Sequence, residues 1–247
     1  MSTAPALPGR RLSARLPRWL IVLGILWPIV LVATQVTAYL VSPPDRDMGH
    51  LQKIMYVHVP AAWNSFIAFF IVAVCSLLYL WKREARHDLL AASAAESGVV
   101  LTALTLMLGS IWGRPTWGVW WTWDARLTST AVLLLIFVSY LALRSFVDDP
   151  DRRATWSAAV GVLGALNVPI VYMSVKWWRT LHQPQSSPST VDPAYALGLR
   201  INAIAFLLML IWFTGMRYRA ALLERAADDA AERLALGGPA TGEVAHA

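Results

Sequence analysis

The chain alternates between long apolar runs and short polar segments. Six apolar runs stand out, and each is close to the roughly 20 residues that an α-helix needs to cross about 30 Å of hydrocarbon. They cover residues 19–41, 61–81, 89–112, 128–147, 154–175 and 197–216. The pattern predicts an all-α, polytopic membrane protein with six transmembrane helices.

The first apolar run has two interpretations. It follows several arginines, and Val36-Thr37-Ala38 weakly resembles the cleavage site of a signal peptide. The run 19–41 is longer, however, than the apolar region of a signal peptide, which spans about 7–15 residues. We therefore expect a span that is not removed.

The composition narrows the class of protein. Hydrophobic residues make up 57% of the chain and charged residues 15%, and the mean hydropathy is +0.51. This mixture excludes a water-soluble enzyme and leaves no room for a large soluble catalytic domain. The net charge of +6 does not indicate nucleic acid as a partner, because the Lys and Arg residues cluster between the apolar runs. The single cysteine, Cys75, excludes an intrachain disulfide and a CxxC site.

The distribution of Lys and Arg predicts which way each loop faces. Fourteen of these residues lie at the N-terminus, at 82–88, at 144–153 and in the C-terminal tail, and the other segments hold seven. By the positive-inside rule, both termini are then cytoplasmic. The loops at 42–60, 113–127 and 176–196 face outward, which in a bacterium is the periplasmic side of the inner membrane.

Two regions of unequal size are expected. Residues 1–216 form the membrane domain, with a tryptophan-rich outer segment at 112–128. Residues 217–247 form a cytoplasmic tail. The first part of the tail, 217–236, has an Ala-rich helical pattern with mixed charge, and 237–247 has the composition of a disordered segment.

The second outer loop is unusually rich in tryptophan. The chain has 13 tryptophans, and five of them fall within the twelve residues from Trp112 to Trp123. An aromatic belt at the membrane surface accounts for one or two tryptophans but not for this density. If the segment is helical, its i, i+3, i+4 and i+7 positions form one face and build an aromatic shelf. These positions are Trp117, Trp120, Trp121 and Asp124.

An aromatic shelf suits a large, flat, apolar ligand. Gly113 and Gly118 allow close approach, and Arg114 and Arg126 can meet acidic groups at the rim of the ligand. Haem, an aromatic macrocycle with two propionates, has these properties.

Asp124 also has a structural interpretation, which we favour over direct contact with the ligand. It can form an ion pair with Arg126, or it can order the start of the fourth span, where Thr128 is a plausible N-cap.

Two histidines flank the shelf at similar predicted depth. His58 lies where the first outer loop enters the second span, and His182 lies just beyond the fifth span. A lone histidine near a helix end is usually solvated or capping, but haem iron needs axial ligands and imidazole is the commonest. We expect His58 and His182 to be the pair, one on each face of the macrocycle, with His50 as the spare candidate.

Other polar groups within the spans also carry expectations. Asn167 and Pro169 should kink the fifth span, since proline removes a backbone donor. Glu96 has a structural interpretation, in which it faces the bundle interior or reaches the surface. The functional alternative is a contact with another subunit. Arg200 either extends to the membrane surface or contacts a propionate.

Three motifs resemble one family in the same order. The runs KIMYVHVPAAW, WGRPTWGVWWTWDARLTS and LNVPIVYMSVKWWRTLHQ are similar to those of the WWD family of haem-handling membrane proteins. With six spans and this length, the chain resembles the C component of the bacterial cytochrome c maturation systems. The resemblance covers roughly residues 45–185.

This resemblance implies haem b as the bound and transported ligand, held at the outer face and presented to a membrane-anchored periplasmic haem chaperone. It also implies an ABC transporter ATPase with a membrane subunit, and a small single-span subunit, as partners. Carried over by motif, the axial ligands are His58 and His182. The platform carried over in the same way is Trp117, Trp120, Trp121, Trp123 and Asp124. Arg126 joins the candidate site because of its charge, as argued above.

Other functions are less consistent with the sequence. A permease that moves haem through the bilayer should have polar or small residues along several spans, and these spans are mostly Leu, Val, Ile and Ala. A purely structural subunit does not account for the outer histidine pair. No GxxxxGK[ST] motif occurs, so we expect a binding and delivery protein that does not itself hydrolyse ATP.

Overall fold

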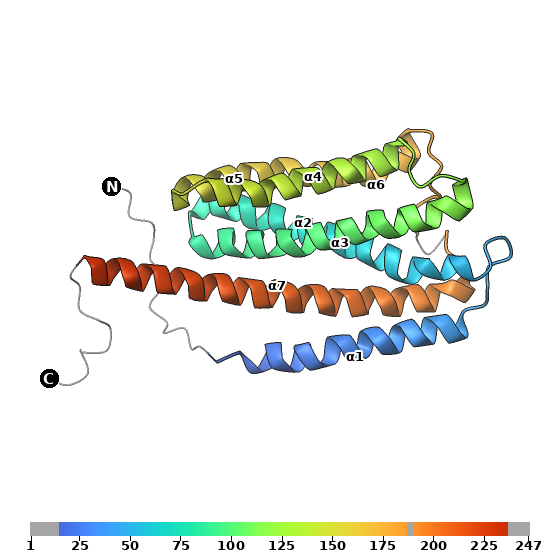
Figure 1. Cartoon of the computed structure of the whole chain (residues 1–247), viewed down its shortest axis with the longest axis horizontal. Helices are drawn as coiled ribbons and strands as arrows, with labels where there is room; N and C mark the ends of the chain where they lie inside the picture. Colours follow the sequence, from blue (N-terminus) through green and yellow to red (C-terminus); the bar gives the residue numbers. More distant parts are fainter. Residues whose placement is uncertain (1–14, 187–189, 237–247) are drawn as a thin grey trace.

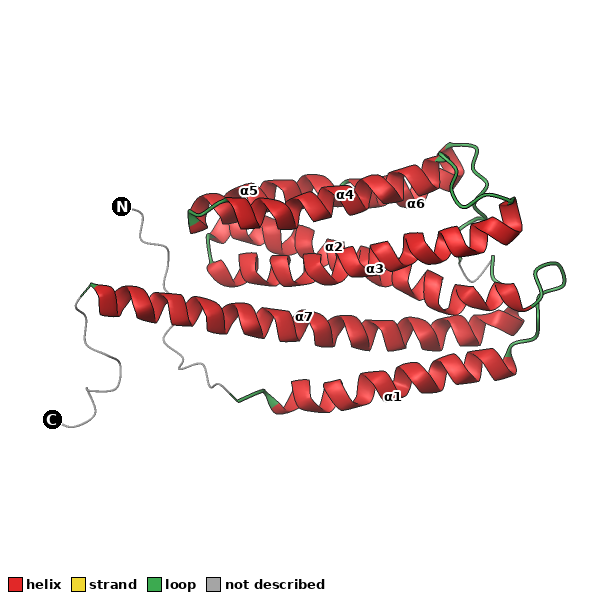
Figure 2. Ribbon diagram, viewed as in Figure 1, coloured by secondary structure: helices red, strands yellow, loops and turns green. Residues whose placement is uncertain are grey.

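The computed structural model describes residues 15–186 and 190–236, which form helices joined by short loops (Figure 2). The helices are α1 (Arg18–Val41), η1 (His50–Ile54), α2 (Met55–Lys82), α3 (Ala85–Trp117), α4 (Ala125–Phe146), α5 (Pro150–Ala165), α6 (Asn167–Trp177) and α7 (Pro193–Ala235). Six helical segments are long and apolar enough to cross a membrane, with η1 and α2 counted as one segment and α5 and α6 as another. The predicted six-span, all-α fold is confirmed.

The helices form a layered bundle (Figure 1). Helices α2 and α3 pack together at its centre, α7 and then α1 lie on one side, and α4, α5 and α6 lie on the other. The start of α1 and the end of α7 lie at the same end, as an even number of spans requires. We call the opposite end, which carries segments 42–54, 118–124, 178–186 and 190–192, the outer end.

Small residues let the central helices approach closely. A Cβ on Gly98 of α3 would lie 2.5 Å from Phe69 of α2, and Phe69 stacks on Phe137 of α4 with 3.8 Å between ring centres. A Cβ on Gly161 of α5 would lie 2.7 Å from the hydroxyl of Ser76. Where lipid surrounds the bundle, this close packing replaces the hydrophobic effect as the source of helix association.

Helix α1 is the most peripheral span, and polar groups hold it against α7. The Trp212 indole N–H donates to the carbonyl of Leu20 at 3.0 Å, and the Thr34 hydroxyl donates to Asn202 Oδ1 at 2.9 Å. Hydrogen bonds of this kind between transmembrane helices are worth roughly 0.6–2 kcal/mol each.

The fifth span is interrupted, as Asn167 and Pro169 predict. Helix α5 ends at Ala165 and α6 begins at Asn167. Pro169 has no N–H to offer the Ala165 carbonyl four residues back, so the helix breaks there. The Asn167 amide donates to the carbonyl of Ser129 in α4 at 2.9 Å, which fixes the interruption against its neighbour.

The tryptophan-rich segment is not a continuous helix, so the predicted one-faced shelf from Trp117 to Asp124 is wrong. Helix α3 ends at Trp117, and Gly118 takes the left-handed conformation with φ of 80°. Its N–H bonds to the carbonyl of Arg114 at 3.1 Å, an arrangement that ends helices. The residues from Gly118 to Asp124 form a loop.

Asp124, rather than Thr128, caps the next helix. The Asp124 carboxylate accepts the backbone N–H of Leu127 at 2.8 Å, and α4 begins at Ala125. The expected structural role of Asp124 at the start of the fourth span is confirmed, and the proposed cap at Thr128 is wrong. Thr128 lies inside the first turn, where its own N–H bonds to the Asp124 carbonyl at 2.9 Å.

Helix α7 joins the sixth span to the first part of the predicted tail. Its 43 residues give a length of about 65 Å, twice the hydrocarbon thickness, and it extends past the other helices (Figure 1). Arg217 binds Glu96 of α3 through two hydrogen bonds, one of 3.0 Å, so Glu96 has a partner within the chain. The segment 237–247, predicted to be disordered, lies outside the described residues.

The glycine contacts lead to a stability prediction. Gly161→Val should clash with Ser76 and Val72 across the α2–α5 interface and cost about 1–3 kcal/mol, because overpacked cores shift backbone. In detergent-solubilised protein the thermal midpoint should fall by roughly 3–10 °C. Ala159→Val, on an exposed position of the same helix, is the control and should leave the midpoint unchanged. Equal midpoints for the two variants would contradict the close-packing argument.

Candidate ligand site at the outer end

Two histidines from separate elements meet at the outer end of the bundle. His58 lies in the first turn of α2, and His182 lies in the segment between α6 and α7. Their ring centres are 6.4 Å apart and the rings are tilted by 30°. The predicted pair is therefore brought together.

A side chain of α1 replaces a backbone hydrogen bond that is missing near His58. Pro60 lies two residues further along α2 and cannot donate to the carbonyl of Tyr56. The side-chain amide of Gln35 in α1 donates to that carbonyl at 3.2 Å. The carbonyl of Tyr56, in the first turn of α2, therefore has a donor although Pro60 provides none.

Helix α3 approaches His58 through a glycine. A Cβ on Gly109 would lie 3.2 Å from Cε1 of the His58 ring, closer than most side chains tolerate. The Nδ1 atom of His58 is buried, and the described residues provide no hydrogen-bond partner for it. A bound ligand would supply the partner that this nitrogen lacks.

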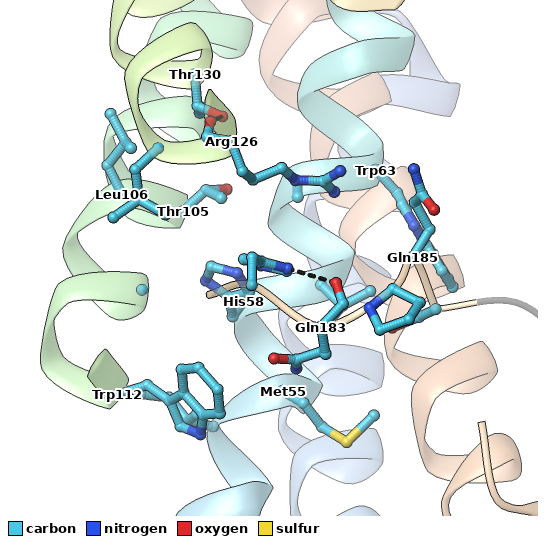
Figure 3. A pocket seen from close by; sticks show the side chains of 18 of the residues that line it. Met55, His58, Trp63, Thr105, Leu106, Trp112, Arg126, Thr130, Gln183 and Gln185 are labelled. Atoms are coloured by element: carbon cyan, nitrogen blue, oxygen red, sulfur yellow. Dashed lines mark hydrogen bonds between the residues drawn. The ribbon is translucent and has the colours of Figure 1, made fainter. Parts of the chain in front are cut away.

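His182 has a hydrogen bond that fixes its tautomer. Its Nδ1 lies 2.8 Å from the carbonyl of Gln183, drawn as the dashed line in Figure 3. Since a carbonyl only accepts, Nδ1 carries the proton and Nε2 keeps its lone pair. Burial lowers the pKa of His182 below its ordinary value, which keeps the imidazole neutral. A neutral imidazole with a free Nε2 is a competent metal ligand.

A cavity surrounds the two histidines. It holds about 130 Å³ and is lined by residues from η1, α2, α3, α4, α6 and the segment after α6. Figure 3 shows side chains of α2, α3 and α4 around it, among them Trp63, Thr105 and Arg126. Its apolar and aromatic wall includes Met55, Trp63, Phe66, Leu106, Trp112 and Trp117, and its polar residues include Gln52, Thr105, Arg126, Thr130, Gln183 and Gln185.

Arg126 contributes a positive charge to this cavity. It donates to the carbonyls of Val171 and Tyr172 in α6, at 3.2 and 3.4 Å. Within residues 15–186 and 190–236, no carboxylate forms an ion pair with it. In particular, the alternative ion pair between Asp124 and Arg126 is not formed. Arg126 is thus available to an acidic group on a ligand.

The tryptophans predicted as one platform separate into two groups. Trp117 lines the cavity together with Trp112, and their rings meet edge to face with 5.1 Å between centres. Trp120 and Trp123 are exposed, by 60% and 82%, and Trp121 packs edge to face on Trp123. None of these three is among the residues that line the cavity.

Three other candidates also lie outside the lining of the cavity. Asp124 is engaged at the start of α4, as described above. His50 begins η1 and stacks on Tyr39, with 6.3 Å between ring centres. Arg200 lies on an exposed face of α7.

Several lining residues were not predicted from the sequence. Trp63 and Thr105 belong to the interiors of apolar runs, where nothing marks them as different from core residues. Gln183 follows His182 directly, and its proximity to a candidate ligand is a signal that could have singled it out.

Comparison with known proteins gives a consistent result. A family described as heme exporter protein C matches residues 4–233. Heme exporter protein C of Bradyrhizobium diazoefficiens is 40% identical over 204 residues, which cover 81% of this chain and 76% of that protein. Heme exporter protein C of Escherichia coli K12 is 36% identical over 206 residues, or 83% of both chains. A putative cytochrome c biosynthesis ccmC-like mitochondrial protein of Marchantia polymorpha is 38% identical over 167 residues, 67% of this chain and 70% of that one.

The matched region contains both histidines of the cavity and all six spans except the last two residues of α7. Its six spans agree with the predicted resemblance, and the match extends well beyond the residues from about 45 to 185 on which that resemblance rested. The chain belongs to the heme exporter protein C family.

Proposed function

We propose that this protein binds haem b at the periplasmic face of the bacterial inner membrane, between His58 and His182, and delivers it to a periplasmic haem chaperone for cytochrome c maturation. The observation that carries this proposal is the histidine pair. Two imidazoles from distant parts of the chain lie 6.4 Å apart in an aromatic cavity. Family membership supports haem as the ligand.

The spacing of the two rings suits an iron between them. A metal about 2 Å from one nitrogen of each imidazole places the ring centres about 6 Å apart. The free Nε2 of His182 and the close approach that Gly109 allows at His58 agree with this arrangement. When bound, haem would supply the iron that these two side chains coordinate.

The cavity encloses only part of such a ligand. A space of about 150 Å³ takes up a single benzene-sized ring, and the space here is about 130 Å³. A macrocycle of four pyrrole rings must therefore project beyond it. The exposed tryptophans of segment 118–124 lie at the same end of the bundle and are suited to contact the projecting part.

The chain's own residues then act by binding and orientation. Trp112 and Trp117 provide apolar surface and exclude water, and Arg126 is placed to pair with a propionate. Coordination by two neutral imidazoles forms no covalent bond to the macrocycle, so a partner that offers a competing ligand can remove it. This reversibility suits delivery.

Delivery requires partners outside the chain. We propose the membrane-anchored haem chaperone as acceptor, with an ABC transporter ATPase, its membrane subunit and a small single-span subunit in the same assembly. The proposal that ATP is hydrolysed by the partner ATPase is supported by the lack of a GxxxxGK[ST] motif in residues 1–247. The excess of Lys and Arg at the opposite end supports an outer end that faces the periplasm.

Substitution of either histidine tests the proposal. His58→Ala and His182→Ala should each lower the haem that co-purifies with the protein by about tenfold or more, because each removes one of two axial ligands. The absorption spectrum should also lose the sharp α and β bands of a six-coordinate, bis-histidine haem. His50→Ala, at the same end of the bundle but stacked on Tyr39, is the matched control and should behave as wild type. A wild-type bis-histidine spectrum in both cavity variants would refute the assignment.

The two groups of tryptophans should differ in their effects. Trp117→Ala removes a cavity wall and should weaken haem retention about fivefold, the loss expected for one aromatic contact of about 1 kcal/mol. Trp123→Ala should lose less haem than Trp117→Ala but slow its transfer to the chaperone, because this side chain is 82% exposed outside the cavity. Retention is measured by haem content after purification, and transfer by haem bound to the chaperone over time. If Trp123→Ala loses haem as readily as Trp117→Ala, the separation into two groups is wrong.

A further inference from the structure

His182 is held by a loop, not by a helix. The segment 178–186 follows the end of α6 and carries no regular secondary structure. The position of the imidazole therefore depends on the hydrogen bonds that fix this loop to the bundle. One of them is donated by the side-chain amide of Gln185, three residues after His182, to the carbonyl of Tyr172 in α6.

The other attachment is the carboxylate of Asp124, whose two oxygens have different partners. Oδ1 accepts the N–H of Leu127 at 2.8 Å and caps α4. Oδ2 accepts the hydroxyl of Thr180 at 2.9 Å and the N–H of Leu181 at 3.3 Å. Hydrogen bonds to an ionised carboxylate are stronger than those between neutral groups.

Thr180 extends this contact to the histidine. Its hydroxyl donates to Asp124, and the same oxygen accepts the backbone N–H of His182 at 3.1 Å. Asp124, Thr180 and His182 therefore form a continuous hydrogen-bonded chain. Through it, the start of α4 and the loop that bears His182 are fixed to one side chain.

We propose that Asp124 is the positioning residue for His182, acting through Thr180 rather than by contact with the ligand. This inference rests on the proposed function, in which His182 is an axial ligand. The same carboxylate orders the first turn of α4, where Arg126 lies two residues further on. One residue thus sets the relative placement of an iron ligand and of the cation beside it.

Two substitutions separate the attachment of the loop from the helix cap. Asp124→Ser keeps an N-cap oxygen but has no second oxygen for Thr180 and Leu181. Thr180→Val breaks the chain at its middle and leaves the cap untouched. Thr180→Ser is the conservative variant that retains the hydroxyl. Thr128→Val is the matched control, because the Thr128 hydroxyl, in the first turn of α4, has no hydrogen-bond partner among the described residues.

The first measurement uses the protein without haem. Hydrogen exchange followed by mass spectrometry should show the Leu181 amide exchanging about tenfold faster in Asp124→Ser, which removes its acceptor, and the His182 amide exchanging about tenfold faster in Thr180→Val. Thr180→Ser and Thr128→Val should match wild type. Unchanged exchange in both loop-breaking variants would overturn the proposal, whatever haem does.

The second measurement uses the haem-loaded protein. Asp124→Ser and Thr180→Val should weaken haem binding about tenfold and convert part of the bis-histidine spectrum to a five-coordinate form. In a His182→Ala background, Asp124→Ser should cause no further loss, because it acts through the residue already removed. Additive losses would show that Asp124 acts independently of His182 and would reject its positioning role.

The two proposals fail in distinguishable ways. If His182→Ala keeps the wild-type spectrum, the assignment of His182 as a ligand fails. Hydrogen exchange in the haem-free variants then still decides whether Asp124 and Thr180 fix the loop.

Discussion

The hydrocarbon core of a membrane offers no hydrogen bonds, so every backbone group within it must find a partner in the protein. This constraint accounts for the main features of the structure. The long helices satisfy their own backbones, and most of the irregular chain lies at the ends of the bundle. Where a proline leaves a span without a backbone hydrogen bond, a polar side chain forms a contact. Gln35 of α1 donates to the carbonyl of Tyr56, and Asn167 fixes the break in the fifth span to the carbonyl of Ser129. The outer end, where helices stop, is therefore where functional side chains can gather.

The two histidines of the cavity are supported in different ways. His58 belongs to a helix that packs along its length at the centre of the bundle, so its backbone is fixed by the fold. His182 depends on a few side-chain hydrogen bonds from Asp124, Thr180 and Gln185. One histidine of the site is therefore held rigidly by a helix, and the other is held by a loop that can adjust. Such a combination suits a ligand that must be held and later given up.

The sequence predicted the architecture because six long apolar runs have few alternatives to transmembrane helices. It also predicted the meeting of His58 and His182, since both lie at span ends on the same side of the membrane. The predicted aromatic shelf is wrong, because the spacing of the tryptophans forms one face only if the helix continues past Gly118. The left-handed glycine and the Asp124 cap both interrupt the helix, and both residues are typical of helix ends. Cavity residues such as Trp63 and Thr105 could not be identified, because their role depends on which helices pack around them.

The hydrogen bond from Gln35 to the carbonyl of Tyr56 gives the first span a structural role that is not apparent from its sequence. The first apolar run and the arginines before it resemble a leader peptide, and helix α1 lies at the edge of the bundle. Yet its Gln35 completes the proline-containing turn that presents His58. A foreign membrane anchor of equal length and hydrophobicity would insert equally well and leave the Tyr56 carbonyl without its donor. The first span is therefore more than an anchor, because one of its polar side chains completes the helix that carries His58.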